Sequence, residues 1–399
     1  MLSVDEMFSS PIMNREHLWV GWSVGVMLLS VGRLSAQVTA PGATLTKLPG
    51  SYSFTEGPTA DVAGNVYFTD QPENRIMKWD AAAGTVTEWM KPAGRANGLM
   101  LTPEGDLLAA ADEHNQLWSI SPDKTVTVLV ENFGGKLLNG PNDVWKTQKG
   151  HIYFTDPLYA RDYWERSSSM QQPGEYVYLI ADGTSAPKAV LTDLSKPNGL
   201  IESPDGKTLY VADIGANKTY AYDIQTDGTL ENKRLFCNKG SDGMTIDSQG
   251  NVYLTGTGGV TVFNKAGTQI QRISVSSQWS WTSNVTFAGA ERDLLFITSG
   301  SSIYSIKMSV TGVVRETSPI TAEEYQIIGN VVGGTNLSLT VPDSVLGHEY
   351  QIWTTANLMD ATWQPVGAIQ TGIGTVLNFD IPIESEASSR YFKVDVQRP

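Results

Sequence analysis

Six polar residues recur along the chain at one position of a repeated pattern, and their side chains could bind a cation together. They are Glu56, Asn97, Asn142, Asn198, Asp242 and Asn284. Burying two carboxylates and four amides in one place is costly unless a partner satisfies their oxygen atoms. Several oxygen ligands without thiolate or imidazole are what a hard cation prefers. We therefore predict one divalent cation at these residues, with Ca²⁺ favoured and Zn²⁺ or Mg²⁺ as alternatives.

Zinc is less favoured because its sites usually include His or Cys. The four histidines lie off the repeated position, and no H-E-x-x-H motif exists. They are His17, His114, His151 and His348. We interpret His114 and His151 as surface residues. Cys237 is the only cysteine, and we interpret it as a buried strand residue.

The elements that must position the six residues are strands. A short strand signature occurs six times, and its copies end at Asp70, Asp112, Asp156, Asp213, Gly256 and Ser299. The intervals between these ends are 42, 44, 57, 43 and 43 residues, close to the period of β-propeller blades. Turn signals and alternating runs lie between the copies, without sustained helical periodicity. The sequence thus predicts an all-β fold with a six-bladed β-propeller over residues 44–312.

The polar residues precede the ends of their strand signatures by 14 or 15 residues. This spacing places all six on the first strand of a four-stranded blade, and first strands line the central channel of a propeller. We expect a strand near residues 44–48 to complete the last blade and close the propeller. Asn and Asp could instead only satisfy backbone groups at strand starts, but such turn chemistry does not explain Glu56 at the same position.

Short motifs surround the six polar residues, which we call the ring residues, and these motifs are specific in combination. They are Glu56-Gly57-Pro58, Asn97-Gly98-Leu99, Pro141-Asn142-Asp143, Pro197-Asn198-Gly199-Leu200 and Ser241-Asp242-Gly243-Met244. In these motifs, over about residues 50–310, the sequence resembles the gluconolactonase, senescence-marker-protein and luciferin-regenerating-enzyme family of calcium-dependent six-bladed propellers. The metal ligands that this resemblance implies are Glu56, Asn142, Asn198 and Asp242. It leaves Asn97 and Asn284 as neighbours of the ligands or as substrate contacts.

One position departs from the pattern of that family. Some members carry an arginine two residues before the ligand that matches Asn142, where it grips substrate hydroxyls. This chain has Gly140 there. The absence of this arginine weakens the case for a sugar acid as the substrate.

The longest interval, 57 residues, indicates an insertion after Asp156. The first strand of a blade begins at the metal end, so the second strand returns there and the inserted loop lies at the same end. The loop contains Tyr159, Arg161, Asp162, Tyr163, Trp164 and Arg166. Such aromatic and guanidinium groups suit a polyhydroxylated or acidic small molecule. We predict that this lid contacts substrate through Tyr159, Arg161 and Tyr163, with Asp143 beside the ring as a further contact.

The ring and the resemblance together imply a metal-dependent hydrolase that opens a small lactone, such as a sugar lactone, to its hydroxy acid. The metal would polarise the carbonyl group and stabilise the oxyanion that forms when water attacks. Asp242 is the first candidate for the general base, with Asp143 and Asp156 as reserves. Two alternatives stay open, because fold alone does not separate them. They are a phosphotriester or aryl-ester hydrolase on the same metal ring, and a propeller that binds without catalysis.

The amino terminus has the pattern of an export signal. An apolar run over residues 18–31 precedes the small residues Ser35 and Ala36, which suit cleavage. We expect loss of residues 1–36 and a periplasmic or secreted protein without stable membrane insertion, and Met13 would give a more ordinary start than Met1. A formal charge of -14, from 42 acidic and 28 basic residues, would repel nucleic acid.

The blade signature stops after about Thr321. Short alternating runs follow at residues 336–341, 349–354, 376–381 and 391–396. They predict a small β-sandwich-like accessory module over residues 325–399. No cluster of acids, bases or metal ligands occurs in its sequence, so we expect it to be dispensable for chemistry. Its role stays open between carbohydrate contact, partner docking and simple stabilisation.

Overall fold

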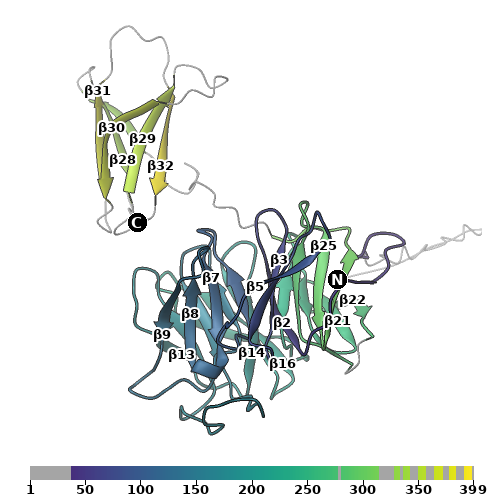
Figure 1. The fold of residues 1–399 in the computed structure, drawn as a ribbon. Coiled ribbons are helices and arrows are strands. Elements are labelled where there is room, and N and C mark those ends of the chain that lie inside the picture. Colours follow the sequence, from purple (N-terminus) through teal and green to yellow (C-terminus); the bar gives the residue numbers. More distant parts are fainter. Residues whose placement is uncertain are drawn as a thin grey trace, which may run out of the picture. The chain divides into compact units, whose positions relative to one another are not determined.

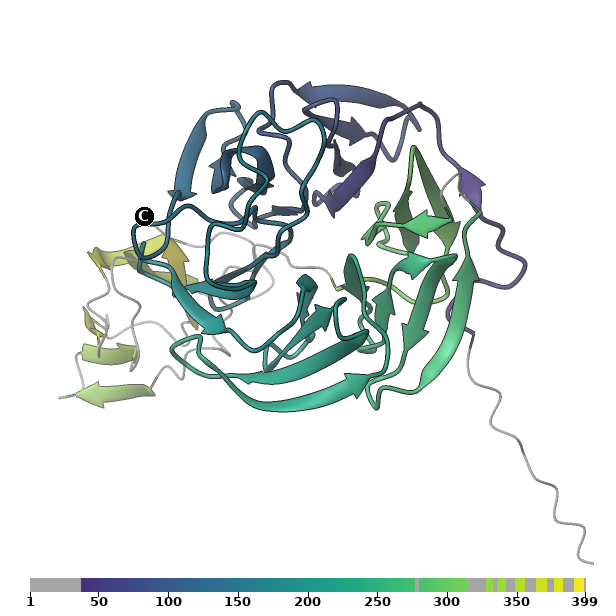
Figure 2. The same ribbon diagram turned by 90° about the horizontal axis from the view of Figure 1, so that it is seen from below.

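The computed structural model describes residues 37–276 and 280–313 of the chain, and six strands between residues 328 and 397. Between residues 46 and 307, the described strands form six four-stranded antiparallel sheets around a central channel (Figures 1 and 2). The prediction of an all-β fold with a six-bladed β-propeller is confirmed. The predicted export signal, residues 1–36, lies outside the described residues.

Each of the first five blades pairs its strands in chain order, so the first strand borders the channel. Blade one contains β2 (Thr55–Ala60), β3 (Val66–Asp70), β4 (Arg75–Trp79) and β5 (Val86–Met90). Blade two contains β6 (Leu99–Leu101), β7 (Leu107–Ala111), β8 (Gln116–Ile120) and β9 (Val126–Val130), with a 3-10 turn, η1 (Asp112–His114), after β7. Blade three contains β10 (Val144–Lys146), β11 (Ile152–Asp156), β12 (Tyr176–Ile180) and β13 (Lys188–Leu191).

The remaining blades follow the same plan. Blade four contains β14 (Pro197–Glu202), β15 (Thr208–Asp213), β16 (Lys218–Ile224) and β17 (Leu230–Cys237). Blade five contains β18 (Met244–Ile246), β19 (Val252–Leu254), β21 (Gly259–Phe263) and β22 (Gln269–Ser274). A small extra sheet pairs β20 (Gly256–Thr257) with β23 (Trp281–Thr282).

The sixth blade joins the two ends of the propeller. It contains β24 (Asn284–Ala288), β25 (Leu294–Ser299), β26 (Ser302–Lys307) and, as its fourth strand, β1 (Thr46–Lys47). Thr46 lies opposite Ser305 in an antiparallel pair. The predicted closing strand is therefore confirmed. Val38, still earlier in the chain, is buried in the core between blades five and six.

The core consists of apolar layers between neighbouring blades. The second strands of the blades are buried on both faces, and all five residues of β7 are buried, whereas outermost strands such as β17 are largely exposed. Phe68 of blade one packs against Phe296 of blade six, with ring centroids 5.7 Å apart. Burial on both faces favours β-branched and aromatic residues and fixes each strand against two neighbours. The channel therefore has a rigid wall.

Three of the aspartates that end the strand signature accept hydrogen bonds from the backbone just before the first strand of a blade. Oδ1 of Asp70 accepts hydrogen bonds from the backbone N–H groups of Ser53 and Phe54, at 2.9 and 3.1 Å. Asp156 and Asp213 accept the corresponding bonds in blades three and four, at 2.8 to 3.0 Å. Hydrogen bonds to a carboxylate are among the stronger ones in proteins. In these three blades, the aspartate thus fixes the backbone just before the first strand of its own blade.

The histidine and cysteine predictions have different outcomes. Cys237 is buried at the end of β17, as predicted. His114 is exposed and lies against Trp118. The prediction that His151 is a surface residue is wrong, because only 5% of it is exposed. Its Nδ1 accepts a hydrogen bond from the backbone N–H of Asp182, and its Nε2 lies 3.2 Å from the carbonyl oxygen of Thr226.

The carboxyl-terminal strands form two three-stranded sheets. One contains β27 (Ile328–Val332), β28 (Asn336–Val341) and β31 (Leu377–Pro382), and the other β30 (Gln364–Thr371), β29 (Glu349–Thr355) and β32 (Tyr391–Gln397), partly labelled in Figure 1. Leu339 and Phe379 of the first sheet pack with Tyr350 and Ile352 of the second. This is a small β-sandwich, and the sequence missed β27 and β30.

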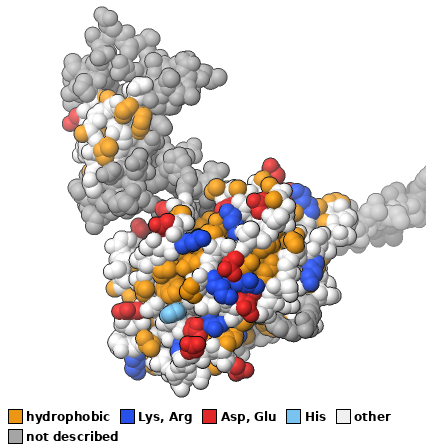
Figure 3. All heavy atoms as spheres, in the orientation of Figure 1, with side chains coloured by type: hydrophobic (Ala, Val, Ile, Leu, Met, Phe, Trp, Pro, Cys, Tyr) orange, Lys and Arg blue, Asp and Glu red, His pale blue; other side chains and the backbone are white. Residues whose placement is uncertain are grey.

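On the face of the molecule shown in Figure 3, acidic and basic side chains are interspersed with apolar ones. The negative net charge is therefore not gathered into one patch on this face. Among the described residues, no helix is long and apolar enough to cross a membrane.

Candidate metal centre and active site

The six polar residues predicted to form a ring all stand at the starts of first strands. Glu56, Asn198 and Asn284 belong to β2, β14 and β24, and the other three lie two residues before β6, β10 and β18. The first strands contact one another in ring order, including β24 with β2. Five of the six side chains are buried, and Asp242 is partly exposed. The six residues therefore surround one end of the channel.

Glycines next to the ring residues let neighbouring blades approach closely. A Cβ atom at Gly199 would lie 2.6 Å from the backbone oxygen of Asp242, and one at Gly243 would overlap the amide of Asn284. Only glycine fits where another chain segment comes this near. The glycine of each such motif therefore serves the close packing of the ring.

The ring side chains form two hydrogen-bonded pairs. Nδ2 of Asn198 donates to Oδ1 of Asp242 at 2.9 Å, and Nδ2 of Asn284 donates to Oε2 of Glu56 at 3.2 Å. Trp281 donates from Nε1 to the second oxygen of Asp242 at 2.6 Å. Both amides thus point their N–H groups at carboxylates. Oδ1 of Asn284 also accepts the backbone N–H of Val285 at 2.8 Å, and a carbonyl oxygen has a second lone pair that could face a cation.

The other two ring asparagines are less constrained. Within the described residues, the side chains of Asn97 and Asn142 form no hydrogen bond. Their backbones are held, since the N–H of Asn142 donates to the carbonyl of Thr155 at 2.9 Å. Their amide oxygens are therefore available to a cation or a substrate.

Carboxyl groups at the ring are held in an unfavourable environment. Burial raises the pKa of Glu56 well above its ordinary value, and the charge of nearby Asp242 raises it further. Burial raises the pKa of Asp242 to about 6, opposed by its hydrogen bonds and by Arg161. Burial is also the main cause that raises the pKa of Asp143 to about 8. A cation among these groups would relieve both their desolvation and their mutual repulsion.

The donor set decides what kind of cation fits. The described residues contain no group of three or more His, Cys, Asp and Glu side chains arranged for metal binding. Amide oxygens would therefore have to complete the coordination that Glu56 and Asp242 begin. An all-oxygen set of mixed charge suits a hard cation with several ligands. The residues present thus fit a divalent cation of this kind.

The lid, residues 157–174, lies at the ring end of the channel, as its position in the chain predicts. The Oη atom of Tyr159 accepts a hydrogen bond from Nδ2 of Asn198 at 3.1 Å. The guanidinium of Arg161 lies over the ring of Tyr159, 5.5 Å from its centroid, and its charge favours the ionised form of Asp242. Nε of Arg161 is buried and has no partner among the described residues. Tyr159 and Arg161 therefore stand beside the candidate site.

Tyr163 lies away from the ring pairs. Its Oη donates to Oε1 of Gln71 at 2.9 Å, and Nε2 of Gln71 donates to Oδ2 of Asp112 at 2.9 Å. Arg95 lies over the ring of Tyr163, with its guanidinium carbon 4.9 Å from the centroid. Tyr163 thus ties the lid to blades one and two, and nothing in its contacts joins it to a carboxylate of the ring.

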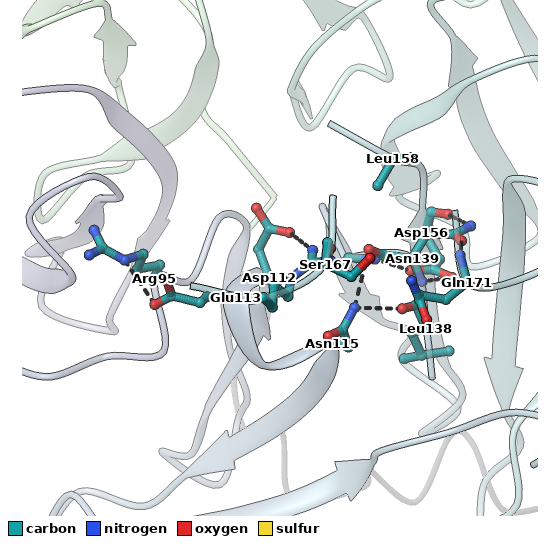
Figure 4. A network of polar contacts seen from close by, with 12 residues as sticks. Arg95, Asp112, Glu113, Asn115, Leu138, Asn139, Asp156, Leu158, Ser167 and Gln171 are labelled. Atoms are coloured by element: carbon teal, nitrogen blue, oxygen red, sulfur yellow. Dashed lines mark hydrogen bonds and ion pairs between the residues drawn. The ribbon is translucent and has the colours of Figure 1, made fainter. Parts of the chain in front are cut away.

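A polar network continues from there under the lid. Figure 4 shows part of it, from Arg95 and Asp112 to Asp156. Arg166 of the lid donates from Nη2 to Oδ1 of Asp112 at 3.0 Å. A Cβ atom at Gly140 would lie 2.6 Å from that same Nη2 atom. The space that a side chain at position 140 would need is therefore occupied by the guanidinium of Arg166.

The reserve bases differ in their contacts. Both oxygens of Asp156 accept backbone N–H groups, from Asn139 and Gly140, so this residue holds the segment before Asn142. Oδ1 of Asp143 accepts the N–H of Val144 at 2.9 Å, and the side chain borders the channel. Of the two, only Asp143 lies close enough to Glu56 and Asp242 for their charges to affect one another.

Sequence reasoning missed Trp281, which donates to Asp242 and stands three residues before Asn284. An aromatic residue so close to a ring position in the chain was the one available signal.

The fold and the ring define a six-bladed propeller with an oxygen-lined site at one end of its channel. The chain belongs to the SMP-30/gluconolactonase/LRE-like family, whose model matches residues 54–301. The family resemblance of the motifs is thereby confirmed.

Three relatives illustrate the range of similar proteins. A gluconolactonase of Zymomonas mobilis is 29% identical over 288 residues, which cover 65% of this chain and 80% of that protein. The structure of a gluconolactonase from Xanthomonas campestris aligns with a TM-score of 0.63 and 26% identity, over 68% of this chain and 91% of the other. A diisopropyl-fluorophosphatase of Loligo vulgaris is 26% identical over 250 residues, or 56% of this chain and 79% of that protein.

Proposed function

We propose that this protein is a lactone hydrolase that opens a small lactone to its hydroxy acid with the help of one divalent cation. The observation that carries the proposal is the buried ring in which Glu56 and Asp242, from blades one and five, share one end of the channel with four amides. The gluconolactonases among its relatives support the reaction class.

The residues that would hold the cation are Glu56, Asn142, Asn198 and Asp242, and Ca²⁺ is the ion we propose. Ca²⁺ accepts six to eight oxygen ligands in flexible geometry, which suits four side chains with room for water and substrate. When bound, the cation would polarise the lactone carbonyl.

Asp242 is the proposed general base. Without a cation, burial raises the pKa of Asp242 to about 6. A bound cation would lower this pKa and hold Asp242 ionised, so the cation would supply much of the activation of the attacking water. Trp281 and Asn198 fix the direction of its oxygens through two hydrogen bonds. Tyr159 and Arg161 of the lid cover the site and can orient substrate, and lid closure would keep bulk water from the reacting group.

The test is an acid-release assay with glucono-δ-lactone, corrected for its spontaneous hydrolysis. We expect turnover that chelation abolishes and added Ca²⁺ restores. Circular dichroism under the same conditions reports whether the metal-free protein stays folded. A folded, metal-loaded protein that opens no lactone in a broad panel would exclude the proposal and favour the non-catalytic alternative.

Hydrolysis of phosphotriesters remains a second candidate, favoured by the similarity to the diisopropyl-fluorophosphatase. A cation polarises a phosphoryl oxygen as it does a carbonyl oxygen, so the ring alone does not discriminate. A phosphotriester and an aryl ester in the same panel compare the three activities directly.

Export to the periplasm or medium is also part of the proposal and rests on the sequence of residues 1–36. Mass spectrometry of protein recovered outside the cytoplasm should find a new terminus near Gln37. An intact Met1 or Met13 terminus would contradict cleavage.

A further inference from the structure

Blade five lacks a brace that three of the other blades share. In blades one, three and four, an aspartate accepts the backbone N–H of a residue 17 positions earlier, as in the pair of Asp156 and Asn139. The corresponding residue of blade five is Gly256, and the residue 17 positions before it is Lys239. Blade five therefore lacks the carboxylate, whereas a lysine at the earlier position also occurs in blade four, as Lys196.

The ammonium group of Lys239 lies beside that glycine. A Cβ atom at Gly256 would be 3.2 Å from Nζ. Nζ donates to the carbonyl oxygens of Thr255 and Gly240, at 3.1 and 3.3 Å. An ammonium group has three donors, so two carbonyl contacts leave one donor for a ligand.

A second cation lies close to the first. Nη2 of Arg272 donates to the carbonyl oxygen of Thr257 at 2.8 Å, and a Cβ atom at Gly258 would lie 2.7 Å from it. Burial, and then the charge of Arg272, lowers the pKa of Lys239. Neither Lys239 nor Arg272 forms an ion pair within the described part of the chain. Two like charges thus face each other without a counter-ion from these residues.

Both cations line a cavity that reaches the candidate active site. Its volume is about 720 Å³, and its wall also includes Asp242 and Trp281. Asp242 is the one carboxylate among the described lining residues, and it already faces Asn198 and Trp281. Cavities of a few hundred Å³ with a few convergent polar groups are typical small-molecule sites.

We propose that this cavity binds an anionic group of the substrate, so that the preferred lactone carries a carboxylate. Lys239 and Arg272 hold the carboxylate while the lactone ring lies at Asp242. Charge-assisted hydrogen bonds to an otherwise uncompensated pair of cations supply the selectivity. This inference rests on the proposed function, since it names the substrate class of the same site.

The experiment compares two γ-butyrolactones that differ only at C5, where one carries a carboxylate and the other the primary amide. We expect the wild-type protein to show a KM roughly tenfold or more lower for the carboxylate. Arg272→Gln should remove most of this difference by raising the KM for the carboxylate alone, while Arg272→Lys restores part of it. Arg234→Gln is the matched control, because Arg234 is exposed on β17 and does not line the cavity.

Lys239→Met is a second variant, expected to act in the same direction as Arg272→Gln. An equal loss for both lactones would mean that Lys239 only braces the backbone of Gly240 and Thr255, and equal KM values in the wild-type protein would overturn the inference. Should neither lactone be opened, the proposed function fails and calorimetry decides the inference separately. Wild-type protein should then bind inorganic phosphate or the ring-opened dicarboxylate, Arg272→Gln should bind neither, and equal binding by both proteins would exclude the anion site.

Discussion

Asn284 donates a hydrogen bond from Nδ2 to Oε2 of Glu56, and this 3.2 Å contact joins the sixth blade to the first inside the channel. The two residues are 228 positions apart in the chain. The ring thus depends on closure of the propeller, and a ligand bound to it would reinforce that closure.

Glu56→Gln should abolish high-affinity cation binding, because it removes one of two carboxylates that face the ring. We expect cation affinity to fall on the order of 100-fold or more, and lactone hydrolysis to fall with it. Calorimetry with Ca²⁺ and the acid-release assay measure the two effects. Glu88→Gln, on the exposed part of β5, is the control. Unchanged affinity in Glu56→Gln would remove Glu56 from the ligand set.

Asp242→Asn tests the general base. Loss of a general base typically costs roughly 100- to 10,000-fold in rate, so kcat should fall by that factor at saturating Ca²⁺. Bound metal must be quantified in the same sample, since Asp242 is also a proposed ligand. A variant that retains its metal and loses less than about tenfold in kcat would assign the base elsewhere, first to Asp143.

Trp281→Phe should change the pH dependence more than the maximal rate. The indole N–H lowers the pKa of Asp242, so its loss raises that pKa and shifts the acid limb of the kcat/KM profile upward by roughly one pH unit. A purely structural role for Trp281 would lower activity equally at all pH values, and the two outcomes are thereby separated.

Stability of the metal-free protein should fall as pH rises from about 4 to 7. Burial raises the pKa of Asp112 from 3.8 to about 7, so the folded state holds its proton more tightly than the unfolded state. The contribution is fully present below the unfolded value and is lost as pH rises through the folded value. Thermal melts in chelator should show this slope, reduced in Asp112→Asn. Asp123→Asn is a control, because hydrogen bonds lower the pKa of Asp123 and move its effect below this pH range.

Removal of the carboxyl-terminal module should leave the chemistry intact. A chain that ends near Ala322 retains every residue of the ring and the lid, and the described module packs its own core around Tyr350. We expect unchanged kcat/KM for glucono-δ-lactone. Complete loss of activity in a truncated protein that still melts cooperatively would show that the module takes part in catalysis.

Much of the propeller could be predicted because its signals are local. In blades one, three and four, the Asp that ends the strand signature accepts the backbone N–H of a residue 17 positions earlier, so the recurrence of this Asp marks the blades. Glu56 and the five other ring residues occupy the same position of this repeat, so their spacing alone identified them as one set. Gln364–Thr371 escaped notice because most of its residues are exposed, which leaves no alternation of apolar and polar residues to detect.

Other features depend on contacts between distant segments. His151 is buried by a turn that contains Thr226, 75 residues further along the chain, and no pattern near His151 indicates that turn. The link between Trp281 and Asp242 spans 39 residues. The cavity lined by Lys239 and Arg272 was recognised only from the structure. There, Gly256 occupies the position that an aspartate has in blades one, three and four.

The pairing of β1 with β26 has a consequence for how the molecule forms. Thr46 and Lys47 leave the ribosome early, yet their partners in the sheet are made about 260 residues later. The last blade therefore cannot assemble during most of synthesis. Its apolar face stays uncovered until both ends of the propeller come together. A circular permutant that begins just before Asn284 and continues from β26 into β1 would make all four strands of that blade in succession, and should refold faster than the natural order.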